Sequence, residues 1–421
     1  MNYLKLAWKN IIHNPLSLLL NLLLLTLGIG LINFILLLNS QLKEKFDNNL
    51  AGIDLVIGAK GSPLQMILSS MYHIDAPTGN ITIKEAKPFL REGHPLIKKS
   101  VPLSMGDSYK GYRIIGTDYS ILELYGAEVQ TGKQWSGLYE VTAGAEVASA
   151  LGLKIGSKFK SSHGFNDDED LEHEEGTFII VGILQPAGSV IDQLLLCSTK
   201  SVWEIHKHQG GQEHDTTHDS IISPLASDMS RATLLTYEEE EITSILIQYV
   251  NKTNFRALNM PRNINENTDL QAASPAYEIN RLYDMMGTGT KALQLLAILI
   301  AIVSAISIFI SLINSLRQRK YELSLLRVLG GRPISLFALI ILEGLIMSIL
   351  GFICGMLLSN IALSGLAESL SDKYNYDFTA WILHGKEQYL FIASLLLGFL
   401  AALLPAVMAY NTDIHKNLSQ G

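Results

Sequence analysis

Four apolar segments, divided by one long polar stretch, constrain the fold more than any other feature of this sequence. The first covers residues 15–38, and the other three cover residues 291–313, 334–358 and 388–410. Each is about 20 residues or longer, enough to cross a bilayer core of roughly 30 Å as a helix. A helix satisfies its own backbone polar groups, so such segments are stable in lipid. The sequence therefore predicts a membrane protein with four spanning helices in a one-plus-three order.

The polar stretch, residues 39–290, is long enough to form a large α+β domain between the first and second spans. Its strand-forming runs are rich in Val, Ile, Tyr and Thr and cover residues 54–57, 112–115, 177–181 and 242–250. Residues 146–151 and 199–205 are predicted to form short helices. The mixture predicts an α+β fold rather than a helical insertion.

The net charge argues against a nucleic-acid-binding protein, and the cysteine content argues against a disulfide-stabilised one. The formal net charge is −8, with 40 acidic against 32 basic residues, so a nucleic-acid partner is not expected. Cys197 lies in the polar domain and Cys354 in the third span, so no disulfide framework is present. The first span is followed by polar residues without a small-residue cleavage site, which favours an uncleaved anchor.

Basic residues near the spans predict the orientation. The loop of residues 314–333 holds five Lys or Arg residues against Glu322 alone, whereas the loop of residues 359–387 is mixed. We therefore expect residues 314–333, the N-terminal residues 1–14 and the C-terminal residues 411–421 to be cytoplasmic. The large domain and residues 359–387 are expected outside the membrane. Residues 1–14 have helical apolar spacing, which predicts an interfacial helix rather than a simple extension of the anchor.

The loop between the second and third spans carries the most specific motif. Leu325, Leu326 and Leu329 form an apolar stripe, and Gly330 with Gly331 stops the helix. A short amphipathic helix of this kind can dock into a groove on a soluble partner. The loop follows the pattern R-x-x-E-x-x-x-L-R-x-L-G, whose members here are Arg319, Glu322, Leu326, Arg327, Leu329 and Gly330.

This pattern resembles the coupling segment of MacB-like, FtsX-type ABC transporter permeases, and the one-plus-three layout is also similar. The resemblance implies that Arg319, Glu322, Leu325, Leu326, Arg327, Leu329 and Gly330 contact an ATPase subunit. It further implies a bacterial inner-membrane protein that forms a homodimer over two ATPase copies, and a periplasmic or lipoprotein partner outside. ATP and Mg²⁺ would bind the partner, because this sequence contains no G-x-x-x-x-G-K-[ST] phosphate loop. The chain itself is then not an enzyme.

A narrower resemblance concerns residues 54–65 and 72–81, which are similar to one MacB-like subgroup associated with metal homeostasis and with His- and Asp-rich external loops. Six of the eleven histidines fall in two polar segments with nearby carboxylates: His163, His173, His206, His208, His214 and His218. Imidazole suits zinc, copper or nickel. We therefore expect either a transition-metal site, with Zn²⁺ the tentative ion, or two solvated polar loops whose histidines bind nothing.

The sequence is compatible with three functions. The first is an ABC permease subunit that transmits ATP-driven motion to the external domain, for export or extraction of a lipoprotein, peptide or metal-linked cargo. The second is a membrane-anchored protein that binds or senses metal outside the cell. The third is a membrane-bound hydrolase, for which no nucleophile and base stand out. Two structural features accompany them. Glu343 lies within a span, which is costly in lipid, so we expect it either to pair across a dimer interface or to lie near the cytoplasmic surface. The small-residue spacings Gly28-x-Gly30 and Gly351-x-x-x-Gly355 permit close helix packing.

Overall fold

The computed structural model describes residues 3–162, 176–207, 231–328, 330–374, 385 and 387–411; within its helices it leaves out the side chains of residues 45, 206, 207, 326 and 368–374. The chain divides into two compact units. The helical unit comprises Met1–Leu42 and Met285–Gly421, and the sheet unit comprises Lys43–Asp284.

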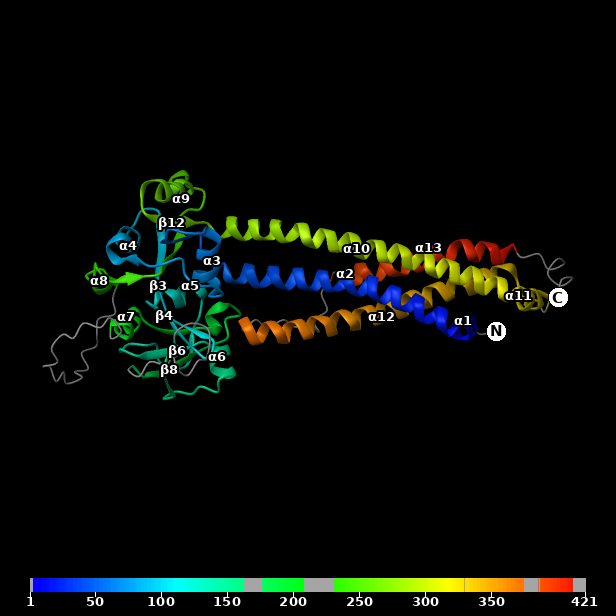
Figure 1. Ribbon diagram of the computed structural model, residues 1–421, viewed down its shortest axis with the longest axis horizontal. Helices are drawn as coiled ribbons and strands as arrows, with labels where there is room; N and C mark the ends of the chain where they lie inside the picture. The colour runs from blue at the N-terminus through cyan, green and yellow to red at the C-terminus, as the bar shows by residue number, and fades with distance from the viewer. Residues whose placement is uncertain are drawn as a thin grey trace. The chain divides into compact units, whose positions relative to one another are not determined.

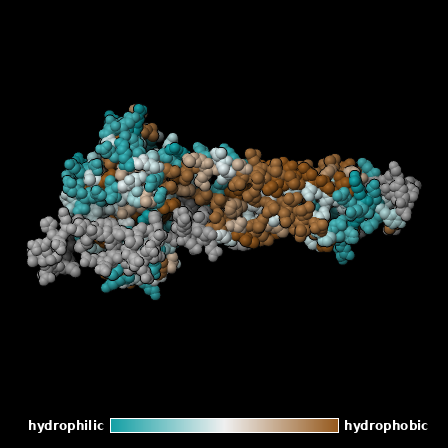
Figure 2. Space-filling model, viewed as in Figure 1, coloured by the Kyte–Doolittle hydropathy of each residue, from teal (hydrophilic) through white to brown (hydrophobic). Residues whose placement is uncertain are grey.

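Six helices build the helical unit or extend from it (Figure 1): α1 (Tyr3–His13), α2 (Pro15–Asn49), α10 (Pro275–Gln318), α11 (Lys320–Val328), α12 (Pro333–Tyr374) and α13 (Glu387–Tyr410). Among the described residues, α2, α10, α12 and α13 are long and apolar enough to cross a membrane, and each contains one predicted span. Hydrophobic residues gather over the surface of these helices in Figure 2. The prediction of four apolar helices is confirmed.

Three of these helices are longer than the predicted spans. α2 has 35 residues, α10 has 44 and α12 has 42. At about 1.5 Å per residue, each exceeds the roughly 30 Å of a hydrocarbon core. The polar ends of α2 and α10 belong to the sheet unit, where Phe46 of α2 meets Tyr283 of α10 edge to face with ring centroids 5.8 Å apart. Helix therefore continues from the apolar spans into the polar sequence.

Glycines set the distance between α2 and α12. A Cβ atom added at Gly30 would lie 3.1 Å from the Gly355 carbonyl oxygen, and one added at Gly351 would lie 2.7 Å from the Leu25 Cβ. Beside them, Asn33 Nδ2 donates to Ser359 Oγ at 2.6 Å. The predicted close packing through these glycines is confirmed, because small residues let the two backbones approach.

The sheet unit contains one large mixed sheet among its described residues (Figure 1). Its strand order is β12-β1-β11-β3-β4-β9-β6-β8-β5, with β7 paired to β8, and β10 pairs separately with β2. β4 pairs with β9 and β6 with β8 in parallel, and the other pairs are antiparallel. The strands are β1 (Leu55–Ala59), β2 (Ile81–Thr82), β3 (Ile97–Tyr109), β4 (Tyr112–Thr117), β5 (Val129–Gly132), β6 (Glu140–Ala143), β7 (Lys158–Phe159), β8 (Phe178–Leu184), β9 (Leu195–Ser198), β10 (Glu241–Ile242), β11 (Ser244–Tyr249) and β12 (Leu270–Ala273).

Short helices join these strands: α3 (Pro63–Tyr72), α4 (Ile83–Leu90), α5 (Ser120–Tyr125), α6 (Ala145–Ala150), the 3-10 turn η2 (Val190–Gln193), α7 (Thr199–Lys207), α8 (Arg231–Leu234) and α9 (Phe255–Asn267). The predicted strands coincide with β1, β4, β8 and β11, and the predicted helices coincide with α6 and α7. The run at residues 242–250 is divided between β10 and β11. The α+β prediction for this domain is confirmed.

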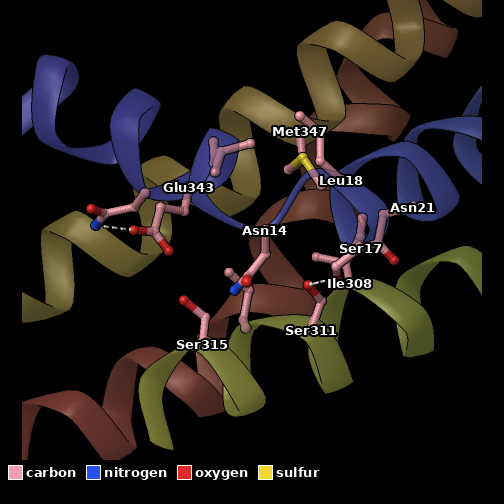
Figure 3. A pocket seen from close by; sticks show the side chains of 12 residues that line it. Asn14, Ser17, Leu18, Asn21, Ile308, Ser311, Ser315, Glu343 and Met347 are labelled. Carbon is pink, nitrogen blue, oxygen red and sulfur yellow. Dashed lines mark hydrogen bonds between the residues drawn. The ribbon is translucent and has the colours of Figure 1, made fainter. Parts of the chain in front are cut away.

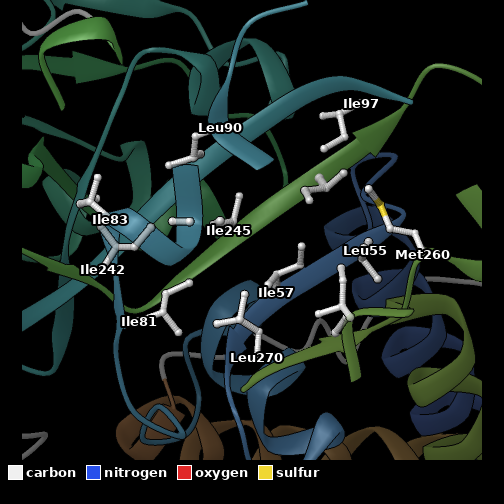
Figure 4. Close-up of a cluster of buried hydrophobic side chains, with 14 of the residues drawn as sticks. Leu55, Ile57, Ile81, Ile83, Leu90, Ile97, Ile242, Ile245, Met260 and Leu270 are labelled. Atoms are coloured by element: carbon white, nitrogen blue, oxygen red, sulfur yellow. The ribbon is translucent and has the colours of Figure 1, made fainter. Parts of the chain in front are cut away.

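Among the described residues of the sheet unit, hydrophobic clusters lie on both halves of the long strand β3. The first packs β1 and β11 against α4 and α9, through residues such as Leu55, Ile245 and Met260 (Figure 4). The second gathers residues of β4, β6, β8 and β9, including Ile114 and Phe178. β3 belongs to both halves, and its register with β4 shifts between Met105 and Ser108. A bulge there lets one strand serve two cores.

Candidate functional site

Helix α11 is a separate short helix held at both ends. Arg319 stands between α10 and α11, and the backbone stays hydrogen-bonded across it: Arg319 N donates to Ser315 O at 3.1 Å and Leu323 N to Arg319 O at 3.0 Å. At the other end Gly330 has φ +99°, a left-handed conformation that glycine adopts without steric cost. Gly330 therefore ends the helical segment, as the sequence predicts.

The two faces of α11 differ in what they contact. Leu323 and Ser324 are buried, and Leu323 packs in one cluster with Ala7 of α1 and Leu339 of α12. Tyr321, Leu325 and Val328 point away from this cluster and are 53%, 45% and 59% exposed. Their spacing of four and three residues places them on one side of the helix. We call Tyr321, Leu325 and Val328 the coupling stripe.

The residues predicted to contact the ATPase and the residues exposed on α11 overlap only in part. Leu325 is exposed, and Glu322 is exposed and pairs with Arg319, whose Nε lies 3.4 Å from Glu322 Oε2. Arg327 is half-buried. The side chain of Leu326 and all of Leu329 lie outside the described residues. Tyr321 and Val328 were absent from the predicted set, although their helical spacing with Leu325 could have identified them.

A polar pocket lies within the helical unit, beside the junction of α1 and α2 (Figure 3). Its cavity has a volume of about 30 Å³. Side chains from α1, α2, α10 and α12 line it together with the α1–α2 link, and most of the polar ones carry amide or hydroxyl groups: Asn10, Asn14, Ser17, Asn21, Ser311 and Ser315. A polar cavity among otherwise apolar helices is unusual, because each unpaired polar group costs free energy in lipid.

Glu343 of α12 supplies the carboxylate of this pocket. It is 2% exposed, and its Oε1 accepts a hydrogen bond from Asn10 Nδ2 at 2.6 Å. The sequence left open whether Glu343 pairs across a dimer interface or lies near the cytoplasmic surface. The structure shows a partner within the same chain, on α1. The two residues are 333 positions apart in the sequence, so local sequence patterns could not predict this contact.

Hydrogen bonds continue from the pocket along α2 and α10. The hydroxyl groups of Ser17 and Ser311 are 2.7 Å apart, and Ser307 Oγ donates to Asn21 Oδ1 at 2.6 Å. Asn14 Nδ2 donates to Gln318 Oε1 at 3.3 Å, close to the start of α11. Such interhelical bonds between polar side chains fix the register of helices in lipid.

The six histidines predicted to bind metal cannot be placed. His163, His173, His208, His214 and His218 lie outside the described residues. His206 belongs to α7, but its side chain is not described. Within the described part of the chain, no group of three or more His, Cys, Asp or Glu side chains could hold a metal ion. The metal site therefore stays a prediction.

The sheet unit contains a buried histidine that the sequence did not single out. His73 ends α3 with φ +53° and is buried close to Arg113 of β4. Burial, with the Arg113 charge second, lowers the pKa of His73 from 6.5 to about 3. Burial likewise lowers the pKa of Arg113 to about 10, although the charges of Asp107 and Asp75 oppose that shift. His73 is therefore neutral at neutral pH and acts as a buried polar group of the fold.

Comparison with known proteins identifies the helical region. Residues 295–414 match the model of the FtsX-like permease C-terminal family. This region of the chain is an FtsX-like permease C-terminal domain. The permease domain contains the membrane part of α10 and all of α11, α12 and α13. The predicted resemblance to FtsX-type ABC permeases is thereby confirmed, and the chain is a multi-pass membrane protein.

Two other comparisons add little. The solved periplasmic region of MacB from Actinobacillus actinomycetemcomitans aligns with 56% of this chain and 97% of its own length, at 12% sequence identity and a TM-score of 0.33. A likeness at this level carries no argument about structure or function. No curated protein matches the sequence.

Proposed function

We propose that this chain is the permease subunit of an ABC transporter, and that it transmits the motion of a separate ATPase to the sheet unit. The FtsX-like permease domain at residues 295–414 supports this role over a membrane-anchored metal sensor or a hydrolase. The chain then catalyses no reaction itself. ATP and Mg²⁺ bind the partner subunit, and the permease converts nucleotide-driven closure into movement of its helices.

The coupling stripe is the observation that carries this proposal. Tyr321, Leu325 and Val328 expose apolar side chains on a nine-residue helix that also carries charged residues. An amphipathic helix that lays apolar side chains into a groove on its partner is a recurrent mode of recognition. Nothing described within the permease covers these side chains, so a partner surface is needed to remove them from water.

The packing of α11 against other helices of the permease can transmit its motion to the membrane helices. Leu323, on the opposite face of α11, packs with Ala7 of α1, Leu316 of α10 and Leu339 of α12. Because packed side chains resist compression, a push on α11 displaces these helices together. α2 and α10 continue as helices into the sheet unit. We propose that they carry the displacement to the sheet unit, where it acts on a periplasmic or lipoprotein partner.

The proposed assembly is a permease homodimer over two ATPase copies in a bacterial inner membrane. Both termini and α11 face the cytoplasm, and the sheet unit lies outside. An impermeant maleimide applied to intact cells tests this orientation. Leu138→Cys, exposed in the sheet unit, is expected to react, and Val328→Cys is expected to react only after permeabilisation. The reverse pattern contradicts the proposed topology, and a mass measurement showing one permease per ATPase pair contradicts the dimer.

Substitution of the stripe tests the ATPase contact. Leu325→Asp places a charge where an apolar groove is expected, so copurification of the ATPase and stimulation of its ATP turnover should be lost. Phe255→Asp is the matched control, since Phe255 is 78% exposed but lies in the sheet unit. Retained copurification in Leu325→Asp would exclude the stripe as the contact.

We also propose that the His-rich segments bind a divalent transition metal such as Zn²⁺. The support is compositional: His163, His173, His206, His208, His214 and His218 lie close to carboxylates in two segments. Neutral imidazole is the ligand, so affinity should fall as pH drops below about 6.5. Calorimetric titration of the whole chain with Zn²⁺ tests this. Heat that is absent, or that survives replacement of all six histidines by Ala, would refute it.

A further inference from the structure

Glu343 is a buried carboxyl group whose described contacts include no cation. Its side chain is 2% exposed in a helix predicted to cross the membrane, and it accepts a hydrogen bond from the neutral amide of Asn10. A buried carboxylate without a cationic partner is costly, and such a group commonly takes up a proton instead. A protonated Glu343 can still accept the Asn10 hydrogen bond through its carbonyl oxygen.

Among the described residues, Arg319 is the cationic side chain whose charge acts on Glu343. It lies one helical turn after Ser315, which lines the pocket, and its backbone N donates to Ser315 O at 3.1 Å. Arg319, however, forms an ion pair with another carboxylate, since its Nε lies 3.4 Å from Glu322 Oε2 on α11. The other charged side chains on α1, namely Lys5, Lys9 and His13, are exposed. Arg317 of α10 is exposed as well. Arg319 therefore pairs with an exposed glutamate and acts through its charge on a buried one.

The pocket beside Glu343 is suited to hold water. Asn10 Oδ1 and Asn21 Nδ2 are buried and have no hydrogen-bond partner among the described residues. The cavity of about 30 Å³ exceeds the roughly 10–15 Å³ that one water requires. The hydroxyl groups of Ser17 and Ser311 lie further along the same pocket, as Figure 3 shows. A proton leaving Glu343 thus has acceptors within the pocket.

We propose that Glu343 and this pocket form a proton-binding site whose occupancy is set by Arg319. While Arg319 pairs with Glu322, Glu343 holds a proton on its carboxyl group. When Glu322 is engaged elsewhere, Arg319 turns to Glu343, and the proton passes from the carboxyl oxygen to pocket water. The carboxylate that remains pairs with the guanidinium. The site is a property of the permease alone, so it can be tested apart from the ATPase contact.

Infrared spectroscopy of the purified full-length chain in an ester-free detergent tests the site. The carbonyl band of a protonated carboxyl group disappears when the group ionises. At about pH 7 the wild-type spectrum should contain such a band that Glu343→Gln removes. Glu387→Gln is the matched control, since Glu387 is also a buried glutamate of the helical unit, and it should leave the Glu343 band in place. Absence of a Glu343-dependent band at this pH would overturn the proposal.

Two further variants test the role of Arg319. Glu322→Gln frees Arg319, so the midpoint pH of the Glu343 band should fall by about one unit or more. Arg319→Gln removes the cation, so the midpoint should rise. Because Glu322 is exposed, Glu322→Gln should leave the fold intact. An unchanged midpoint in Glu322→Gln refutes control by Arg319. A band that appears at about pH 7 only after Na⁺ and K⁺ are removed would show a cation site in its place.

Discussion

Asn10 Nδ2 and Glu343 Oε1 are 2.6 Å apart, and this hydrogen bond joins the N-terminal helix α1 to the membrane helix α12. Ala7, one turn earlier on α1, is fully buried in the cluster that also receives Leu323 of α11. The N-terminal helix is thus fixed to α12 by a polar contact and to α11 by apolar packing. We therefore expect α1 to move when α11 moves, because both helices contribute to this apolar cluster.

Removal of the Asn10 side chain should release α1. Asn10→Ala leaves a buried carboxyl group without its amide donor, which costs about 1–3 kcal/mol. Hydrogen exchange across residues 3–13 is therefore expected to accelerate, with little change in the sheet unit. Lys9→Ala, at an exposed neighbouring position, is the control. Equal exchange rates in the two variants would show that the Asn10–Glu343 contact does not hold α1.

Contact between α12 and α13 depends on two glycines. A Cβ atom at Gly344 would lie 2.6 Å from the Ala402 Cβ, and one at Gly398 would lie 2.5 Å from the Ser348 Cβ. Gly344→Ala and Gly398→Ala should each destabilise the chain by about 1–3 kcal/mol, because neither helix can move away without losing other contacts. Gly365→Ala adds the same methyl group to α12 where no atom lies within 4 Å. Thermal unfolding in detergent compares them, and equal midpoints for all three variants would contradict the observed packing.

The sheet unit should lose stability in mild acid through His73. The pKa of His73 is about 3 in the fold against 6.5 in the unfolded chain. Between these values the unfolded chain binds a proton that the folded chain excludes, so stability falls as pH drops from about 6.5 towards 3. His73→Asn removes the titration and keeps a residue that tolerates the left-handed conformation. The variant should therefore show a shallower acid dependence.

Hydrogen exchange of residues 63–80 at several pH values, corrected for intrinsic rates, measures this slope. His13→Asn is the control, since His13 is exposed in the helical unit. An acid dependence in His73→Asn as steep as that of the unchanged chain would show that another group is responsible.

The split between the two faces of α11 gives a further prediction. Leu323→Asp buries a charge among Ala7, Leu316 and Leu339, so it should lower the stability of the helical unit. Leu325→Asp changes an exposed position, so it should leave the free energy of unfolding within about 0.5 kcal/mol of wild type while ATPase binding is lost. Loss of stability in both variants alike would contradict the assignment of the two faces.

Long-range contacts explain what the sequence could and could not predict. The four apolar segments and the strands β1, β4, β8 and β11 follow from local composition, and all were identified. The helical continuations of α2 and α10 into polar sequence depend on tertiary packing, such as the contact of Phe46 with Tyr283. Phe46 and Tyr283 are 237 positions apart in the sequence, so local patterns could not predict their contact.

The same reasoning applies to the candidate site. The sequence located the amphipathic helix α11 and its glycine end correctly, because both depend on local spacing and conformation. It named Leu325, Leu326 and Leu329 as one stripe, whereas the inward face is decided by what Leu323 meets on α1, α10 and α12. Tyr321 and Val328 share a face with Leu325 by helical spacing, but the packing of Leu323 decides that this face is the outward one. The pocket at Glu343 combines four helices and had no counterpart in the sequence pattern.

Site-specific photo-crosslinking at position 325 tests the central claim most directly. A benzophenone amino acid replaces Leu325 in one variant and the exposed Leu357 of α12, within a membrane span, in another. Both are expressed with the ATPase, illuminated with and without ATP, and analysed by mass spectrometry. We expect a cross-link from position 325 to the ATPase that changes in yield with ATP, and none from position 357. A cross-link to the ATPase from position 357 with none from position 325 would contradict it.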